Sequence, residues 1–424
     1  MLDREHVGDQ SPQAISFDRL WDSLGAAAEI GRWRSCGVQR LALTDADRRM
    51  RDTFCAWCRD AGLHVRVDRI GNIFARRQGA AELAPVMIGS HLDSQVAGGR
   101  FDGALGVLAG LEILRSLDDR GIETRRPVEV VSWSNEEGAR FSPPMLGASV
   151  FTGALPLERA LAAPDGDGAT FGTELARIGY AGAAPVPGAP PAAYFELHIE
   201  QDDVLHRRGL ELGIVTGAFT AHAAVLRLRG ATAHSGATPM RRRRDAVAGA
   251  AEICCGLDRL TGAHGSDARA TTTRLTVWPN RPGIVAGEAV LSIDYRHPTT
   301  AGAEAMRRDV DELVRDACDR HGLECERLGD WSFGDRVTFD PELANLVRRN
   351  ARLLGVQTTD MTSSAGHDAY LLAGVSPTAI LFTPCVDGIT HNEHEDVDPE
   401  RIAPAVDVLA RAVVDAADGE VRGD

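Results

Sequence analysis

Four short polar segments of this 424-residue chain carry residue types that perform hydrolytic chemistry. Each combines imidazole with carboxylate or pairs two carboxylates. The segments are G-S-H-L-D-S-Q-V-A-G-G-R-F-D-G at 89–103, S-N-E-E-G at 134–138, E-L-H-I-E-Q at 196–201 and H-N-E-H-E at 391–395. Imidazole and carboxylate together are ligands that Zn²⁺ and similar divalent ions prefer. The four segments therefore predict a metal site.

The number of suitable side chains indicates two ions rather than one. Three His, one Asp and one Glu are too many for one tetrahedral ion with an open position, but they suffice for two ions if one carboxylate bridges. Two metals about 3.5–4 Å apart can hold a hydroxide, polarise a carbonyl and stabilise a tetrahedral intermediate. Of the adjacent Glu136 and Glu137, one carboxylate then binds metal and the other takes a proton from water. Gly138 permits the sharp turn that this requires.

Each segment alone also has a structural interpretation. A single histidine such as His91 or His198 is often a core residue, a Glu-Glu pair is usually surface charge, and the His391 loop alone could be a solvated turn. The coincidence of all four segments favours a metal site. Serine-hydrolase G-x-S-x-G, phosphate-binding G-x-x-x-x-G-K-[ST] and metalloprotease H-E-x-x-H patterns are absent from the sequence.

Short β-rich runs must position these segments. The predicted strands are Pro85–Ile88, Val128–Trp133, Tyr194–Leu197 and Thr378–Phe382. Strands that alternate with helix-like segments favour an α/β fold, with a mostly parallel sheet between helices. The carboxyl ends of such strands form the ligand crevice, so the polar segments can converge there. The first 75 residues are predicted to be helical, at Ser16–Leu24 and Leu41–Ala61.

A second, smaller domain is predicted between two segments of the catalytic domain. A Pro- and Gly-rich connection occupies residues 162–192. Beyond it the pattern is β-α-β-β-α-β, which is typical of a compact α+β unit. Its predicted elements are Ala223–Leu228, Arg244–Leu257, Arg274–Val277, Ala289–Ile293 and Ala301–Asp319. We therefore predict catalytic segments at 1–212 and 333–424 around a domain at 213–332.

Composition excludes several classes of partner. The chain has 46 Lys and Arg against 61 Asp and Glu, a formal net charge of −15, which argues against nucleic acid or an anionic membrane. No apolar run approaches the roughly 20 residues that span a bilayer. The charged N-terminus lacks the apolar region of a signal peptide. The eight cysteines are scattered, and Cys55 and Cys58 are expected to be buried helix residues, so we expect reduced thiols and a cytoplasmic location. The Arg241–Arg244 run is expected to be a surface feature at a helix start.

Together these motifs resemble the hydantoinase/carbamoylase group of dinuclear, M20 metallopeptidase-like amidohydrolases. Further motifs carry the resemblance: A-H-S-G-A-T-P-M-R-R-R-R-D-A, A-G-H-D-A and D-G-I-T-H-N-E. The match runs in order from about residue 70 to 410. The group includes N-carbamoyl-L-amino-acid hydrolases, β-ureidopropionases and allantoate amidohydrolases. The resemblance implies a zinc-aminopeptidase-like catalytic domain and a lid domain that also forms a homodimer.

The resemblance also implies roles for individual residues. The implied metal ligands are His91, Asp102, Glu137, His198 and His391. Asp102 would bridge the two ions, and Glu136 would be the general base that later returns the proton to the leaving nitrogen. Asp93 would be a carboxylate that orients the His91 imidazole.

The implied substrate contacts come from both domains. Gln201 matches the amide that follows a metal-binding His. His234 matches the lid histidine that reaches the partner subunit's site and holds the oxyanion. Arg296 matches the residue that binds the substrate carboxylate. His367 and Asp368 are expected to border the pocket, where Gly366 leaves room for substrate.

One position departs from the pattern of the group. The usual P-N-x-x-N-[VI]-[IV]-P-G appears here as P-N-R-P-G-I-V-A-G. Asn280 matches the first Asn, but Gly283 replaces the substrate-binding Asn and Ala286 replaces Pro. Because sites built to hydrogen-bond one group discriminate strongly, this change is expected to alter which amide is accepted.

We therefore predict an enzyme that uses two divalent ions (Zn, Mn, Co or Ni) to hydrolyse a linear C–N amide bond. The expected substrate is a small molecule bearing a carboxylate, an N-carbamoyl amino acid or ureido acid, which would give amine, CO₂ and ammonia. The alternatives are an allantoate-type amidohydrolase, an N-acyl-amino-acid deacylase or peptidase on the same fold, and a non-enzymatic binding protein. A complete ligand set with Glu136 argues against the last.

Overall fold

The computed structural model describes residues 15–333 and 337–420, so the charged N-terminus discussed above lies outside the described residues. The chain divides into two units. The first contains the residues up to Gly217, Thr338–Met361 and the residues from His367 onward, and the second contains Ala218–Val337 and Thr362–Gly366. The divisions predicted at 212/213 and 332/333 fall a few residues earlier than these. Strand β8 (Leu212–Ala218) explains the first difference, because it still pairs with the large sheet of the first unit.

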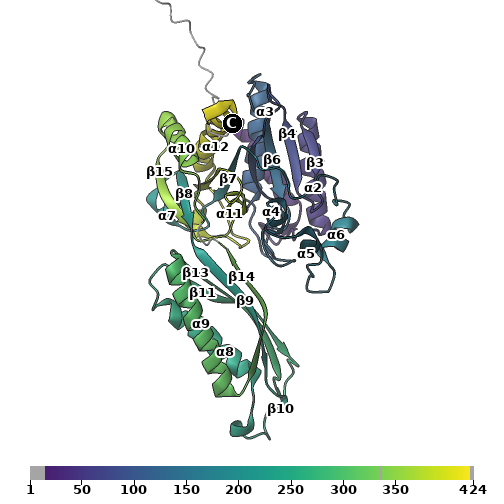
Figure 1. Ribbon diagram of the computed structural model, residues 1–424, viewed down its shortest axis with the longest axis vertical. Coiled ribbons are helices and arrows are strands. Elements are labelled where there is room, and N and C mark those ends of the chain that lie inside the picture. The colour runs from purple at the N-terminus through teal and green to yellow at the C-terminus, as the bar shows by residue number, and fades with distance from the viewer. Residues whose placement is uncertain (1–14, 334–336, 421–424) are drawn as a thin grey trace, which may run out of the picture. The chain divides into compact units, whose positions relative to one another are not determined.

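An eight-stranded sheet forms the centre of the first unit (Figure 1). Its spatial order is β15 (Thr358–Ser363), β8, β16 (Thr378–Thr383), β7 (Ala193–Ile199), β5 (Val86–His91), β6 (Val128–Trp133), β4 (Ile73–Arg77) and β3 (His64–Val67). The four inner strands β16, β7, β5 and β6 run parallel to one another. Strands β8, β4 and β3 pair antiparallel outside them. The four predicted strands are these four inner strands.

Alternation of side chains gives the inner strands two different faces. On β7, Phe195, Leu197 and Ile199 join the main apolar core, so the side chain of His198 lies on the opposite face. On β5, Val86 and Ile88 join the same core. Along β5, His91 lies on the face opposite to Val86 and Ile88, as His198 does on β7. The two strands are parallel neighbours. The sequence pattern therefore places both imidazoles on one face, near the carboxyl ends of their strands.

Long helices cover the core face of the sheet. They are α1 (Phe17–Glu29), α2 (Asp45–Asp60), α3 (Ala104–Asp119), α10 (Pro341–Leu354) and α12 (Pro399–Asp415). Polar caps fix their starts: Thr44 accepts a hydrogen bond from the backbone of α2, and Asp398 precedes a proline at the start of α12. The remaining helices of this unit are short: α4 (Leu146–Phe151), α5 (Leu157–Leu161), α6 (Phe171–Arg177), α7 (Val204–Arg208) and α11 (Ala369–Leu372).

The second unit has the predicted β-α-β-β-α-β order. Its elements are β9 (Thr220–Arg229), α8 (Ala246–Thr261), β11 (Arg269–Trp278), β13 (Glu288–His297), α9 (Thr300–His321) and β14 (Glu324–Phe333). The four strands form an antiparallel sheet in the order β11-β13-β9-β14, and its own apolar core lies between the sheet and the two helices. A small ladder pairs β10 (Ala233–His234) with β12 (Ile284–Val285).

The helical prediction for the first 75 residues was incomplete. Helices α1 and α2 match it, and Cys55 and Cys58 are buried in α2 as expected. Strands β3 and β4 and the small hairpin of β1 (Arg32–Trp33) and β2 (Gly37–Val38) were missed. Each is short, and its pairing partner rather than its own composition determines its structure.

None of the helices in the described part of the chain combines the length and apolar character needed to cross a membrane.

Candidate metal centre

Three of the predicted ligands meet at the ends of parallel strands. His91 is the last residue of β5, His198 is the second-last of β7, and Asp102 lies just before α3. The Asp102 Oδ1 atom is 3.1 Å from His198 Nε2 and 3.5 Å from His91 Nε2. All three side chains are buried. We call these three residues the first group.

Asp102 is also part of a second group, which includes Glu137 and His391. His391 Nε2 lies 3.3 Å from Asp102 Oδ2 and 3.3 Å from Glu137 Oε2. Within each group the candidate ligand atoms all lie within 4.8 Å of one another. One carboxylate therefore presents one oxygen to each group, which is the arrangement that a bridging ligand between two cations requires.

Two of the imidazoles are oriented as metal ligands are. The Nδ1 of His91 lies 2.9 Å from the Asp93 carbonyl, and that of His198 lies 2.9 Å from the Ile199 carbonyl. A carbonyl oxygen only accepts hydrogen bonds, so Nδ1 carries the proton in both rings. Nε2 of each ring therefore faces Asp102 and carries a lone pair once its proton is lost, so this donor set fits a divalent ion.

The role predicted for the Asp93 side chain needs a correction. The carbonyl of Asp93, not its carboxylate, holds the His91 ring. The carboxylate instead accepts the backbone N–H groups of Glu136 and Glu137, at 3.2 and 3.3 Å. The sharp turn after β6 brings these N–H groups within reach of Asp93, so Asp93 fixes the loop that carries both glutamates.

Glu136 lies beside the first group. Its Oε2 is 3.5 Å from His91 Nε2, and the residue is only 8% exposed. Burial raises the pKa of the Glu136 carboxyl well above its usual range; His91 opposes this effect, and Asp368 and Glu137 add to it. The loop that carries the two glutamates turns at Gly138. The φ of this residue is +65°, a conformation that glycine adopts readily.

The charges of the cluster favour a cation at its centre. Burial lowers the pKa of His91, but Glu136 and the other carboxylates outweigh it and raise this pKa well above its ordinary value. At His391, burial again lowers the pKa of the imidazole. The carboxylates of Glu137 and Asp102 outweigh this effect and raise the pKa to about 9. Burial raises the pKa of Asp102, but hydrogen bonds with the surrounding imidazoles hold it well below its usual range. Positive charge here is stabilised by carboxylates on several sides.

Two polar side chains hold the second oxygen of Asp102. The Gln201 Nε2 donates to Asp102 Oδ2 at 2.9 Å, and Thr390 Oγ1 donates to the same oxygen at 3.2 Å. The Gln201 Oε1 is buried and has no hydrogen-bond partner among the described residues. The predicted substrate-binding amide therefore lies against the metal cluster with its acceptor unused.

His367 also packs against the cluster. Its ring centroid is 4.5 Å from that of His198, with the two rings edge to face. Gly366, which precedes it, is the last residue of the second unit. The chain thus passes from one unit to the other directly beside a predicted pocket residue.

Comparison with known proteins identifies the family. The model of peptidase family M20/M25/M40 matches residues 87–415. The chain belongs to this family. An N-carbamoyl-L-amino-acid amidohydrolase of Rhizobium meliloti is 41% identical over 95% of this chain and 97% of its own length. One of Geobacillus stearothermophilus is 33% identical over 96% and 100%. The solved structure of a hydantoinase/carbamoylase family amidase from Burkholderia vietnamiensis is 44% identical, with a TM-score of 0.94 over 98% of this chain and 100% of that one.

These matches confirm the predicted resemblance and the α/β fold class. They also confirm that the chain is a hydrolase of a metal-dependent family whose relatives act on amides. The metal cluster lies within the matched residues of the family.

The second unit carries the remaining predicted contacts. The Nδ1 of His234 accepts the N–H groups of Gly236 and Ala237, both at 3.0 Å. The neutral ring therefore carries its proton on Nε2, and His234 is exposed. It presents a hydrogen-bond donor, which is what stabilisation of an oxyanion requires. Its contact with substrate stays a prediction.

Arg296 is already paired within the second unit. Its guanidinium contacts both oxygens of Asp294, at 2.8 and 3.2 Å, and donates to the Ser364 carbonyl at 2.8 Å. A substrate carboxylate would therefore compete with Asp294 or share the guanidinium with it. Asn280 and Gly283 both have positive φ values, and a Cβ at Gly283 would meet no atom within 4 Å. The position at which the resemblance led us to expect an amide is therefore open.

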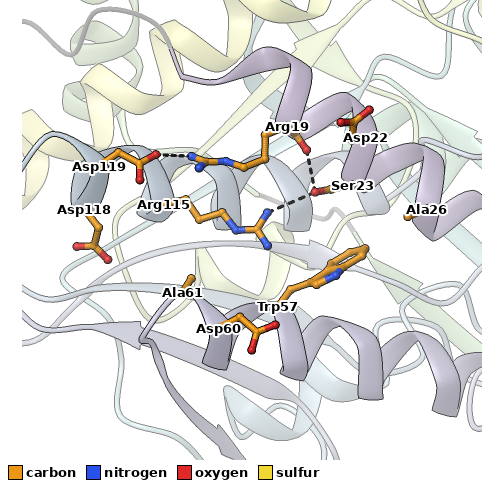
Figure 2. Close-up of a pocket in the computed structure, with 10 residues that line it drawn as sticks. All are labelled: Arg19, Asp22, Ser23, Ala26, Trp57, Asp60, Ala61, Arg115, Asp118 and Asp119. Atoms are coloured by element: carbon orange, nitrogen blue, oxygen red, sulfur yellow. Dashed lines mark hydrogen bonds and ion pairs between the residues drawn. The ribbon is translucent and has the colours of Figure 1, made fainter.

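A separate hollow of about 490 Å³ lies among α1, α2 and α3 (Figure 2). Arg115 extends into it, donating to Ser23, and Trp57 and Asp60 line the opposite side. None of the predicted site residues lines this hollow. Arg115 belongs to the last turns of α3, whereas Asp102 precedes the first turn of that helix. The hollow and the candidate metal ligands therefore lie at different ends of α3.

Three further buried carboxyl groups lie near the cluster: sequence analysis assigned no role to Glu395 and Glu196, and it expected Asp368 only to border the pocket. Glu395 accepts the backbone N–H groups of Phe101 and Asp102, and Glu196 accepts the N–H of Ala369. Neither oxygen of Asp368 has a hydrogen-bond partner among the described residues, and burial raises the pKa of this carboxyl well above its usual range. The signal for Glu196 was available, because a charged residue within an apolar strand needs a specific partner.

Proposed function

We propose that this protein hydrolyses the amide bond of an N-carbamoyl amino acid or a related ureido acid, with two divalent ions as cofactors. The observation that carries the proposal is the position of Asp102, whose two oxygens face two separate groups of ligands. The names of the relatives support the carbamoyl substrate class. The products would be an amino acid, CO₂ and ammonia.

The proposed mechanism assigns a task to each side chain. His91, Asp102 and His198 would hold one ion, and Asp102, Glu137 and His391 the other. Zn²⁺, Mn²⁺, Co²⁺ or Ni²⁺ ions bound there would polarise the substrate carbonyl and lower the pKa of water.

Glu136 would move the proton. It accepts a proton from the attacking water and then gives it to the leaving nitrogen, so that the C–N bond breaks and the amine departs neutral. Its Oε2, 3.5 Å from His91 Nε2, lies beside the first group, where both transfers would take place.

The remaining contacts would orient the substrate. The unused Oε1 of Gln201 accepts a hydrogen bond from the carbamoyl N–H₂, and Arg296 binds the substrate carboxylate. His234 donates from Nε2 to the oxyanion. His367 and Gly366 border the pocket.

We also propose a homodimer in which His234 serves the partner subunit's site. The second unit carries several exposed apolar side chains, which supports a protein contact there. They are Met240, Leu275, Trp278 and Ile284. The cytoplasm is the proposed compartment, because all eight cysteines are free thiols.

An allantoate-type substrate is the second candidate, because allantoate deiminases of Arabidopsis thaliana and Glycine max are also relatives of this chain, each 29% identical. A deacylase or peptidase activity on the same fold is a third possibility for the same metal cluster.

A panel of carbamoyl, ureido, acyl and dipeptide substrates tests the proposal. Ammonia release and amine formation would be measured with protein loaded with each of the four metals. We expect turnover of a carbamoyl or ureido acid. Inactivity on all of these, together with clear hydrolysis of acyl-amino acids or dipeptides, would show that the substrate class is wrong.

A further inference from the structure

His391 differs from the other predicted ligands in how it is held. His91 and His198 belong to strands, whereas His391 lies in the loop between β16 and α12. Its side chain is 46% exposed, and its φ of +50° places a non-glycine residue in the left-handed region. Such a conformation is disfavoured for a residue with a side chain and persists only where surrounding contacts impose it. Other segments must therefore hold this loop.

Glu395 holds the inner side of the loop. Its Oε1 accepts the N–H groups of Phe101 and Asp102 at 2.9 and 3.1 Å, and its Oε2 accepts from Thr390 at 3.2 Å. The Thr390 hydroxyl, next to His391, also lies 3.2 Å from Asp102 Oδ2, so its one proton is shared between the two carboxylates. These contacts join the loop to the segment that carries the bridging carboxylate.

The β1–β2 hairpin holds the outer side. Arg34 forms an ion pair with Glu393 at 2.7 Å, and the Cys36 thiol donates to the Glu393 carbonyl at 2.9 Å. Val38 pairs with Gly98 through two backbone hydrogen bonds, at 2.9 and 3.0 Å. The hairpin thus contacts both the His391 loop and the segment that leads to Asp102.

Gly37 lies at the closest approach between the hairpin and the loop. A Cβ placed there would be 2.7 Å from the Glu393 Cβ and 3.1 Å from the Gly98 carbonyl oxygen. The φ of Gly37 is not positive. A methyl group would therefore push the loop away without straining the hairpin's own backbone.

We propose that the β1–β2 hairpin is a positioning element for one metal site of the pair. It holds the 391–395 loop in the position in which His391 contacts Asp102 and Glu137. Loosening this contact weakens binding of the ion at the second group and leaves the ion at the first group in place. The inference rests on the proposed two-metal function.

Gly37→Ala is the variant that tests it. Metal-free protein would be titrated with Zn²⁺ and, separately, Co²⁺, with binding followed by calorimetry and by the visible spectrum of Co²⁺. Wild type should bind two ions. We expect the variant to bind one ion with unchanged affinity and the other at least about tenfold more weakly, a difference of about 1.4 kcal/mol.

Gly166→Ala is the matched control, because a Cβ at Gly166 meets no atom within 4 Å. It should bind both ions as wild type does. If Gly37→Ala does not fold, the double variant Arg34→Ala/Cys36→Ala removes the hairpin's polar contacts and should weaken the same single site.

Equal weakening of both sites, or two unchanged affinities in folded Gly37→Ala, would overturn the positioning role. A wild-type protein that binds fewer than two ions would instead overturn the proposed two-metal function, so the two failures differ.

Discussion

The carboxylates of the cluster need a cation to neutralise them, and either protons or metal ions can do so. Without metal, protons on the imidazoles serve this purpose, and metal ions would compete for the same Nε2 atoms. The raised pKa of His391, about 9, and the raised pKa values of His91 and Glu136 all describe the metal-free protein. Proton binding and metal binding are therefore linked.

A pH dependence of stability follows. A group whose pKa is higher in the folded state stabilises the fold below its unfolded pKa and loses this contribution as pH rises through the folded value. Metal-free protein should therefore lose stability between about pH 6.5 and 9, the window of His391. Thermal unfolding from pH 6 to 9.5 checks this. His391→Asn should show a shallower loss, and an equal slope in both proteins would contradict the assignment.

Glu136→Gln separates the two adjacent glutamates. The amide keeps the size of the side chain but cannot accept the proton of water, so turnover should fall by a factor on the order of 10²–10⁴. Metal content, measured by elemental analysis, should stay near that of wild type because Glu137, not Glu136, is the proposed ligand. Loss of metal from this variant would mean that the roles of the two residues are exchanged.

At the scale of elements, the sequence was most informative where periodicity and burial agree. The four inner strands and the β-α-β-β-α-β unit were predicted because their apolar patterns are strong. The β1–β2 hairpin was not, because two-residue strands have no periodicity. The contact of Glu395 with Asp102 joins residues 293 positions apart and depends on the fold alone. For Asp93, the resemblance implied that the carboxylate orients His91, whereas the backbone carbonyl makes this contact, because the carboxylate turns toward the N–H groups of Glu136 and Glu137.

The start of α3 shows how an element positions a ligand. Gly103, directly before the helix, has a φ of +65°, and a Cβ there would overlap the His91 ring. Gly103→Ala should lose the ion of the first group and also destabilise the fold, because φ of +65° with ψ of −46° is disfavoured for a residue with a Cβ. Gly121→Ala is the control, with a φ of +63° and no atom near the added Cβ. It should show a similar backbone cost in denaturant unfolding but keep both ions. Metal retention in Gly103→Ala would contradict this account of the helix start.

At the scale of the whole molecule, the proposed activity needs two subunits. His234→Ala and Glu136→Gln homodimers should both be inactive. In a mixed dimer, one site would combine an intact Glu136 with an intact His234 from the other subunit, and the second site would lack both. About half of the wild-type activity per mixed dimer should return, as measured after subunit exchange. No recovery in verified mixed dimers would mean that His234 does not serve the opposite site.

The central claim is that Asp102 bridges two cations. The most direct measurement is a crystal structure of Zn²⁺-loaded protein with anomalous diffraction at the zinc edge. We predict two peaks about 3.5–4 Å apart, one beside His91 and His198 and the other beside Glu137 and His391, with one Asp102 oxygen on each. A single peak in fully loaded crystals, or ions bound away from Asp102, would contradict the account.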